Sequence, residues 1–241
     1  MLAPEALRLL IVEILCPTAA IAGTEAFPTV AGNLVYDSRE IPVQDIDRDR
    51  DFTPVIAVHG NDARITSRGE LTDFSDVEQQ AVIDIVVELA VVAEDNQGEF
   101  ADAMAGTDPT ARLVLAALCS RIRYLLEFSE KGVAWRRLVR RVVNLEEMPF
   151  SVPDLGLRFQ RMTLRYTIEI APDTYCEDGG LPEPIRSVAA TLPDGSYAKL
   201  KLQQLGAYFL AESPEALQEI AGTAHVTERV DLTVGVSSLS S

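Results

Sequence analysis

The chain has 241 residues, 47% of them hydrophobic, which suits one large domain or a core of roughly 150 residues with an extension. This composition excludes collagen-like, low-complexity and wholly disordered chains. No uncharged apolar run approaches the roughly 18 residues that a membrane span needs. The apolar stretch at residues 7–15 contains Arg8 and Glu13, unlike a signal peptide. We therefore expect neither secretion nor a membrane partner.

The formal net charge of −16 argues against tight wrapping of DNA, which needs clustered cations. The charge is unevenly distributed. Residues 121–165 hold ten cations and five acids, so this segment carries +5 and the remainder −21. A basic element on an acidic body favours head-to-tail packing with copies of the same chain, or contact with another acidic partner.

Cysteine and histidine usage gives no sign of a metal site. Cys16, Cys119 and Cys176 are far apart and lack CxxC spacing, which argues against zinc and against a dense disulfide framework. Three reduced thiols, one internal pair and one disulfide between subunits remain open. The two histidines cannot build a three-histidine zinc site, and no phosphate-binding or dinucleotide-binding glycine motif occurs. We expect no cofactor.

Hydrophobic spacing predicts an opening helix that ends before Pro17, followed by a loop over residues 17–33. A short strand at 34–36 and a charged loop at 44–51 come next. A strand at 54–59, a turn at 60–62 and a strand at 63–68 would form a hairpin. Strict alternation over 82–92 predicts a long strand with Asp84 and Glu88 on its polar face.

The next residues, 95–108, are predicted as a loop or weak helix. Asp108-Pro109 begins an amphipathic helix that reaches about residue 128. After Gly132 we expect a second helix that presents one cationic face. Alternation from residue 157 to 170 predicts another long strand.

The pattern changes at Pro172, so we place a boundary between a core at 1–171 and an extension at 172–241. In the extension we expect a strand pair around Pro193-Asp194-Gly195 with arms at 189–191 and 197–202, a helix at 214–220 and a strand at 226–236. The predicted class is α+β, a mixed or antiparallel sheet with helices packed on one face, plus a C-terminal α/β extension.

One segment, Ala-Gly-Asn-Leu-Val-Tyr-Asp-Ser-Arg-Glu-Ile-Pro at residues 31–42, resembles the Gly-x-x-Val-Tyr-Asp-Ser-Arg turn and strand of bacteriophage tail terminator proteins. Pro-Val-Ile-Ala-Val at 54–58 is similar to the strand that follows in that family. The resemblance covers residues 1–171 in element order and spacing. Two features depart from the family: the extension at 172–241, and His59-Gly60-Asn61, where a Tyr or Thr is expected.

The resemblance implies a structural protein of the virion, not an enzyme. Such proteins are assembled in the host cytoplasm as a homo-hexameric ring at the head-proximal end of the tail. The ring stops polymerisation of the tail tube and, in a contractile tail, of the sheath. Its implied partners are the tail tube protein, the sheath protein and the head-tail connector or neck proteins, while genomic DNA passes through the lumen without specific binding. The alternatives are a neck connector or a small cytoplasmic metal-dependent hydrolase.

Two charged groups are candidate contact sites in such a ring. The cationic helix face would meet a neighbouring subunit or the tube, together with Arg39 and the loop at 44–51. Asp84 and Glu88, roughly 13 Å apart at about 3.3 Å per residue, would face the lumen or a neighbour rather than pair with each other. The residues of the cationic face are Arg136, Arg137, Arg140 and Arg141.

The hydrolase alternative would use Asp84, Glu88 and His59. It lacks the Gly-x-Ser-x-Gly motif that positions a serine nucleophile. Asp194 with Lys199 and Lys201 is faintly similar to a metal-dependent nuclease core, but the second acid that such a core needs is missing. Asp37 is expected to cap backbone amides in a turn, a structural role.

Overall fold

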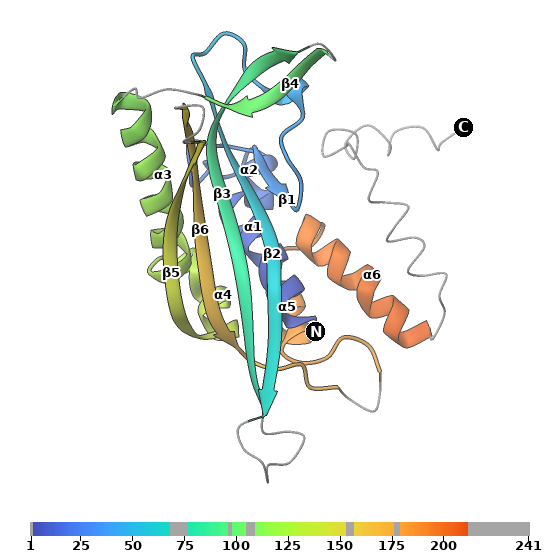
Figure 1. Ribbon diagram of the computed structural model, residues 1–241. Helices are drawn as coiled ribbons and strands as arrows, with labels where there is room; N and C mark the ends of the chain where they lie inside the picture. Colours follow the sequence, from blue (N-terminus) through green and yellow to red (C-terminus); the bar gives the residue numbers. More distant parts are fainter. Residues whose placement is uncertain are drawn as a thin grey trace, which may run out of the picture.

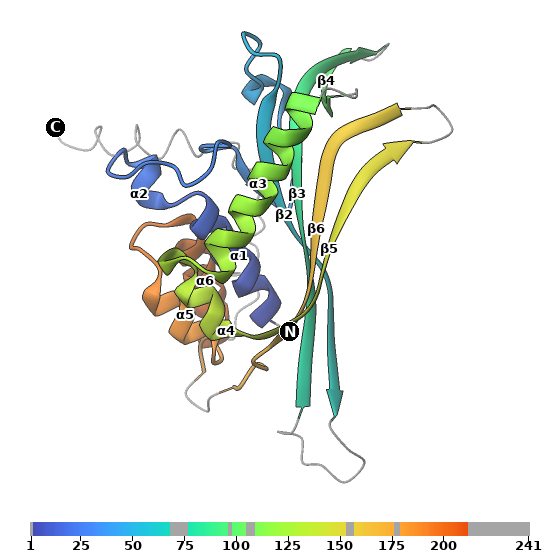
Figure 2. The same ribbon diagram turned by 90° about the vertical axis from the view of Figure 1, so that its left-hand side faces the viewer.

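A computed structural model describes residues 2–67, 77–95, 98–104, 109–152, 157–175 and 179–211. One mixed β-sheet of six strands is covered by helices on one face only, as Figure 2 shows. The predicted α+β class and its single helical layer are therefore confirmed.

The sheet has the order β1-β2-β3-β6-β5, with β4 paired to β3. Only β1 and β2 run parallel; the other neighbours are antiparallel. The β2–β3 hairpin extends past the helices, and the β5–β6 hairpin bends away from them (Figure 2). The strands are β1 (Val35–Asp37), β2 (Thr53–Ser67), β3 (Val77–Asp95), β4 (Gly98–Ala103), β5 (Val139–Val152) and β6 (Leu157–Ile170).

The helical layer is built around α1 (Ala3–Leu15), whose residues are all buried except Glu5 and Arg8. A helix that is apolar nearly all round must be enclosed by other elements. Asp173 accepts hydrogen bonds from the first amides of this helix, at Leu2 (2.6 Å) and Ala3 (2.9 Å). The other helices are α2 (Thr18–Ile21), η1 (Val43–Asp45), α3 (Pro109–Glu127), η2 (Glu130–Gly132), α4 (Val133–Leu138), α5 (Ile185–Thr191) and α6 (Tyr197–Ala211), seen in Figure 1.

The main core lies between this layer and the sheet. Alternate residues of β3 face the helices, and Ile83, Ile85 and Val87 are at most 1% exposed. Tyr166 of β6 packs edge-on against Trp135 of α4, with ring centroids 6.2 Å apart. The predicted long strands at 82–92 and 157–170 and the predicted helix at 109–128 are confirmed.

Several predicted elements are wrong. The hairpin proposed over 54–68 is one continuous strand, β2, because the Gly60-Asn61-Asp62 turn signal produces a bulge instead. The loop or weak helix proposed over 95–108 contains strand β4, which pairs with the end of β3. The helix after Gly132 stops at Leu138, where the chain turns into β5.

The strand pair proposed around Pro193-Asp194-Gly195 is also wrong: helices α5 and α6 flank this turn. Gly195 adopts φ +75°, which the turn requires. The side chains of Ile185, Leu192 and Leu202 belong to the main core, so the described part of residues 172–211 shares one core with residues before 171. The predictions for 214–220 and 226–236 lie outside the described residues.

Candidate functional site

Residues 34–39 contact three parts of the molecule, namely strand β2, the charged loop at 44–51 and the helical layer. β1 lies beside β2 in parallel register, Val35 opposite Ile56, so the two sequence pieces that resemble the terminator family are neighbouring strands. The Tyr36 hydroxyl donates to Asp45 at 2.9 Å, which holds the charged loop. The Arg39 guanidinium lies 5.0 Å from the centroid of the Tyr36 ring.

Asp37 points the other way, into the helical layer. It forms an ion pair with Arg8 of α1 and accepts a hydrogen bond of 2.9 Å from the Tyr197 hydroxyl of α6. Ser38 follows with φ 53°, which turns the chain. The expectation that Asp37 caps backbone amides is therefore corrected: its carboxylate fastens two helices to the sheet.

The helix-free face of the sheet carries three cross-strand ion pairs. Arg165 of β6 lies directly opposite Asp84 of β3, and Arg161 lies opposite Glu88. The nitrogen-to-oxygen distances are 2.7–2.8 Å for Arg165 with Asp84 and 2.6 Å for Arg161 Nε with Glu88. The third pair joins Arg141 of β5 to Glu169 of β6 at 3.2 Å. Opposite charges placed directly across neighbouring strands stabilise a sheet.

Asp84 and Glu88 are each only 7% exposed. They lie on the polar face that the alternation predicted, but the arginines of β6 cover them. Asp84 also accepts a hydrogen bond of 2.6 Å from the Asn61 amide, and Asn61 is the residue that the β2 bulge inserts. The hydrogen bond and charge of Asp84 raise the pKa of Arg165 above its ordinary value. Both carboxylates are engaged by arginine guanidinium groups.

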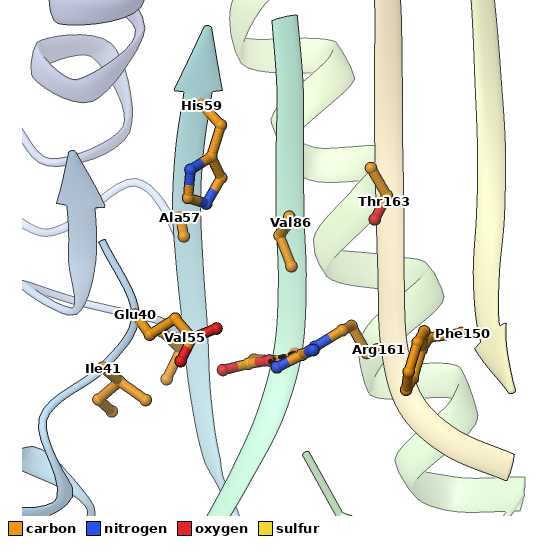
Figure 3. A pocket seen from close by; sticks show the side chains of 10 residues that line it. Glu40, Ile41, Val55, Ala57, His59, Val86, Phe150, Arg161 and Thr163 are labelled. Atoms are coloured by element: carbon orange, nitrogen blue, oxygen red, sulfur yellow. Dashed lines mark hydrogen bonds and ion pairs between the residues drawn. The ribbon is translucent and has the colours of Figure 1, made fainter. Parts of the chain in front are cut away.

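A hollow of about 200 Å³ lies on this face, between the bend of β6 and the segment after β1 (Figure 3). Glu88 and Arg161 meet in it, and the Phe150 ring lies over the Arg161 guanidinium at 5.5 Å. Figure 3 shows His59 and Glu40 at other points of its rim. The full lining is Glu40, Ile41, Val55, Ala57, His59, Val86, Glu88, Phe150, Arg161 and Thr163.

The residues of the hydrolase alternative lie together on the helix-free face, where His59 of β2 is directly opposite Asp84 of β3. His59 and Glu88 both line the hollow, but Glu88 is bound by Arg161, and Asp84 is bound by Arg165. Among the residues that the structure describes, no group of three or more His, Cys, Asp or Glu is placed to hold a metal ion. His225 lies outside these residues. Asp194 pairs with Lys199 at 2.7 Å where α6 begins.

The predicted cationic helix face does not exist as one surface. Arg136 is in α4 and donates to the carbonyls of Leu126 and Ser129, which closes the end of α3. Arg137 lines a separate groove between α1, α4 and the turn before α6. Arg140 and Arg141 belong to β5, because the helix ends at Leu138. Arg141 is the partner of Glu169.

The cysteines do not support a disulfide between subunits. Cys16 is 0% and Cys119 3% exposed, so neither sulfur is accessible for the disulfide between subunits that the sequence left open. Burial is the main cause that raises the pKa of the Cys119 thiol to about 12, so at neutral pH it is protonated and unreactive. Cys176 lies outside the described residues.

The pairing of β3 acids with β6 arginines was not predicted, although the sequence carries a signal for it. Asp84 and Glu88 are four residues apart in one alternating strand, and Arg161 and Arg165 are four apart in the other. Equal spacing with opposite charge favours antiparallel pairing of these strands in this register.

Comparisons of this chain with protein-family models, with curated proteins and with solved structures found no match. Within the described residues, no helix is long and apolar enough to span a membrane.

Proposed function

We propose that this protein is a structural subunit of a phage tail, which forms a ring on the end of the tail tube, terminates its polymerisation and presents the surface that joins the head. The observation that carries the proposal is the far end of the β2–β3 hairpin, which we call the arm and which extends beyond the helical layer (Figure 2). From Gly60 to Ser67 every residue of β2 is exposed except Ala63, which is half-buried.

A two-stranded ribbon in water is only marginally stable by itself. The tip of the arm is such a ribbon: β3 pairs with β6 as far as Gln79, and beyond it Thr66 pairs with Glu78 and Ser67 with Val77 without a third strand. A partner that packs against it would supply the missing support. In a ring, the arm of each subunit reaches the next subunit through a heterologous contact, and such contacts close when the rotation between copies permits.

The helix-free face supports a lumen through which DNA slides. Arg141, Arg161 and Arg165 each have a carboxylate partner on this face, so a phosphate backbone meets no uncompensated cluster of cations there. The exposed parts of the pairs are the arginine heads, since side-chain exposure is 36% for Arg165 and 10% for Asp84. The sequence suggested a lumen with exposed acidic side chains. In the structure the arginines on this face are neutralised by carboxylates, and in this proposal that charge compensation, rather than excess negative charge, prevents tight DNA binding.

The sequence resemblance to tail terminator proteins adds support, because its two matching pieces are neighbours in the fold. Its two quoted sequence pieces become β1 and the first part of β2, and their register buries Val35 and Ile56 together in the main core. Tail tube protein, sheath protein in a contractile tail, and neck proteins are the proposed partners. The proposed location is the head-proximal end of the virion tail.

The proposal is tested by tube growth in vitro. Tail tube protein encoded by the same genome is polymerised with and without equimolar purified chain, and tube lengths are measured by negative-stain electron microscopy. A terminator is expected to shorten the tubes and to appear as a cap at one end.

The matched control is a variant in which the β2–β3 arm is shortened at its tip by replacement of residues 66–78 with a short turn, its fold checked by circular dichroism. It is expected to leave tube length unchanged because the arm contact is lost. Uncapped tubes with the intact chain would contradict the proposal. Binding of the chain to neck proteins without an effect on tube length would favour the connector instead.

A further inference from the structure

Helix α3 has a second apolar stripe, on the side that faces away from the core. Its inner side buries Leu115, Ile122 and Leu126 against the sheet and α1. Its outer side exposes Leu113 by 70%, Tyr124 by 49% and Phe128 by 64%. These positions, with Ala117 between them and Phe128 directly after the end of the helix, are four, seven and four residues apart and fall on one side of α3.

The loop after α2 enlarges this stripe. Arg121 Nε donates to the Pro28 carbonyl at 3.0 Å, and Lys131 pairs with Glu25 at 2.7 Å, so the loop is fastened along the C-terminal half of α3. The loop exposes Phe27 by 37% and Val30 by 68%. We call the combined surface the α3 patch: Phe27, Val30, Leu113, Ala117, Tyr124 and Phe128. Contiguous exposed apolar side chains of this kind mark interaction sites.

Cations border the α3 patch on both sides. Arg121 lies over the Tyr124 ring at 5.3 Å on one side, while Arg112 and Arg123 are exposed on the other. Glu127, the acid nearest to them in α3, has a side chain that is only 15% exposed and is paired with Arg123. An apolar centre with a cationic border fits an acidic protein surface with apolar side chains of its own.

We infer that the α3 patch is the surface through which one copy of this chain binds a second copy. The chain itself is the acidic partner, because outside residues 121–165 it carries a charge of −21. The helix lies along one edge of the molecule, opposite α6 (Figure 1). In a ring of more than two copies the contact is heterologous, so α3 meets a different surface of the neighbour. The inference rests on the proposed function and specifies its subunit interface.

Native mass spectrometry and sedimentation of the full chain test the inference. The patch variant carries Leu113→Ser, Tyr124→Ser and Phe128→Ser. The matched control carries Val143→Ser, Phe150→Ser and Leu200→Ser, three exposed apolar residues (42–45%) that lie outside both the α3 patch and the arm. We expect wild type and control to form oligomers, and the patch variant to need at least a tenfold higher concentration. Raising the salt concentration should weaken the wild-type oligomer, because the border is charged.

A second measurement does not depend on how the triple variant folds. A photo-crosslinking amino acid replaces Phe128, and chains with normal and heavy isotopes are mixed before irradiation. Cross-linked peptides that combine the two isotopes, with the acidic part of the chain as acceptor, are expected. Cross-links only within one chain, a monomeric wild type, or a patch variant that assembles as the wild type does would each overturn the inference.

These outcomes separate the inference from the proposed function. A chain that caps tail tubes but assembles without the α3 patch would leave the function standing and refute the interface. A chain that assembles through the α3 patch but never shortens tubes would leave the interface standing and refute the function.

Discussion

The two faces of the sheet are held by different forces, although they share the same strands. On β3, Ile83, Ile85 and Val87 pack beneath the helices, whereas the residues between them include Asp84 and Glu88, which pair with arginines of β6. The covered face is stabilised by burial of apolar surface. The helix-free face combines charge pairing across strands with a smaller buried apolar cluster that includes Ile41, Val55 and Ala90. A sheet can thus leave one face without helices and still keep its register.

This difference bears on function. An apolar face without helices would be an aggregation hazard or a binding surface, whereas a compensated polar face tolerates water. Leu113 and Phe128 on the outer side of the helical layer are 70% and 64% exposed, more than Phe150 on the helix-free face, which is 44% exposed. We therefore assign the helix-free face to a wet surface and the helical layer to subunit contact.

The largest effect is expected on the covered face. Ile85→Ala removes a side chain that is 0% exposed, and the resulting cavity should lower the free energy of unfolding by about 2–5 kcal/mol. Val143→Ala on β5, where the side chain is 45% exposed, serves as the control and should change it by less than about 0.5 kcal/mol. Urea denaturation measures both. If both variants lowered the free energy of unfolding equally, the helices would not exclude water from this face of the sheet.

A smaller effect is expected on the helix-free face. Arg165→Val leaves the buried Asp84 carboxylate with only the Asn61 amide among its present side-chain partners. The loss should be about 1–3 kcal/mol in the same urea assay, less than for a fully buried pair because Arg165 is partly exposed.

The double variant Asp84→Val with Arg165→Val sharpens this prediction. It removes both charges, so most of the lost stability should return. A double variant as unstable as the two single variants added together would show that the ion pair is not what places the strands.

A third prediction concerns the edge where the two faces meet. Tyr197→Phe removes the hydroxyl that donates to Asp37, and so removes one link between α6 and β1. We expect a loss of about 1 kcal/mol, the usual contribution of one hydrogen bond. Hydrogen exchange should show faster exchange in α6 than in α3. Uniform exchange throughout would contradict a local role for this contact.

The smallest effect is expected for a fully exposed pair. A hydrogen bond from Arg48, with its charge, lowers the pKa of Glu99. A lowered carboxylate pKa favours the folded state above the ordinary pKa, and this contribution disappears as the pH falls through the lowered value. Arg48→Ala should therefore raise the Glu99 pKa in an NMR titration and leave the thermal midpoint nearly unchanged. A clear drop in the midpoint would show that exposed pairs matter more than we expect.

The long periodic elements could be predicted because one physical pattern dominates each of them. Leu7, Leu10 and Ile14 repeat at helical spacing in α1, and strict alternation marks β3 and β6. The Gly60-Asn61-Asp62 turn signal failed because cross-strand pairing on both sides of it outweighed the local preference, so the chain bulges and β2 continues.

Other errors came from segments that lacked a dominant pattern. Pro193-Asp194-Gly195 is a turn, but turns join helices as well as strands; the four-residue spacing of Ala198, Leu202 and Gly206, all buried in α6, is the signal that favoured a helix. The arginines at 136–141 were assigned to one helix because the end of α4 has no proline to mark it. The surface that these arginines form therefore could not be predicted. The pairing of Asp84 with Arg165 could have been predicted from the equal spacing of opposite charges on the two strands.

The most direct test of the central claim is the length of phage tails. Tails are imaged by negative-stain electron microscopy in a lysate of a phage that lacks this gene, with the gene supplied in trans as the control. We predict headless tails of uncontrolled, excess length that return to normal length when the gene is supplied. Tails of normal length without the gene would contradict the claim that this protein stops tube growth.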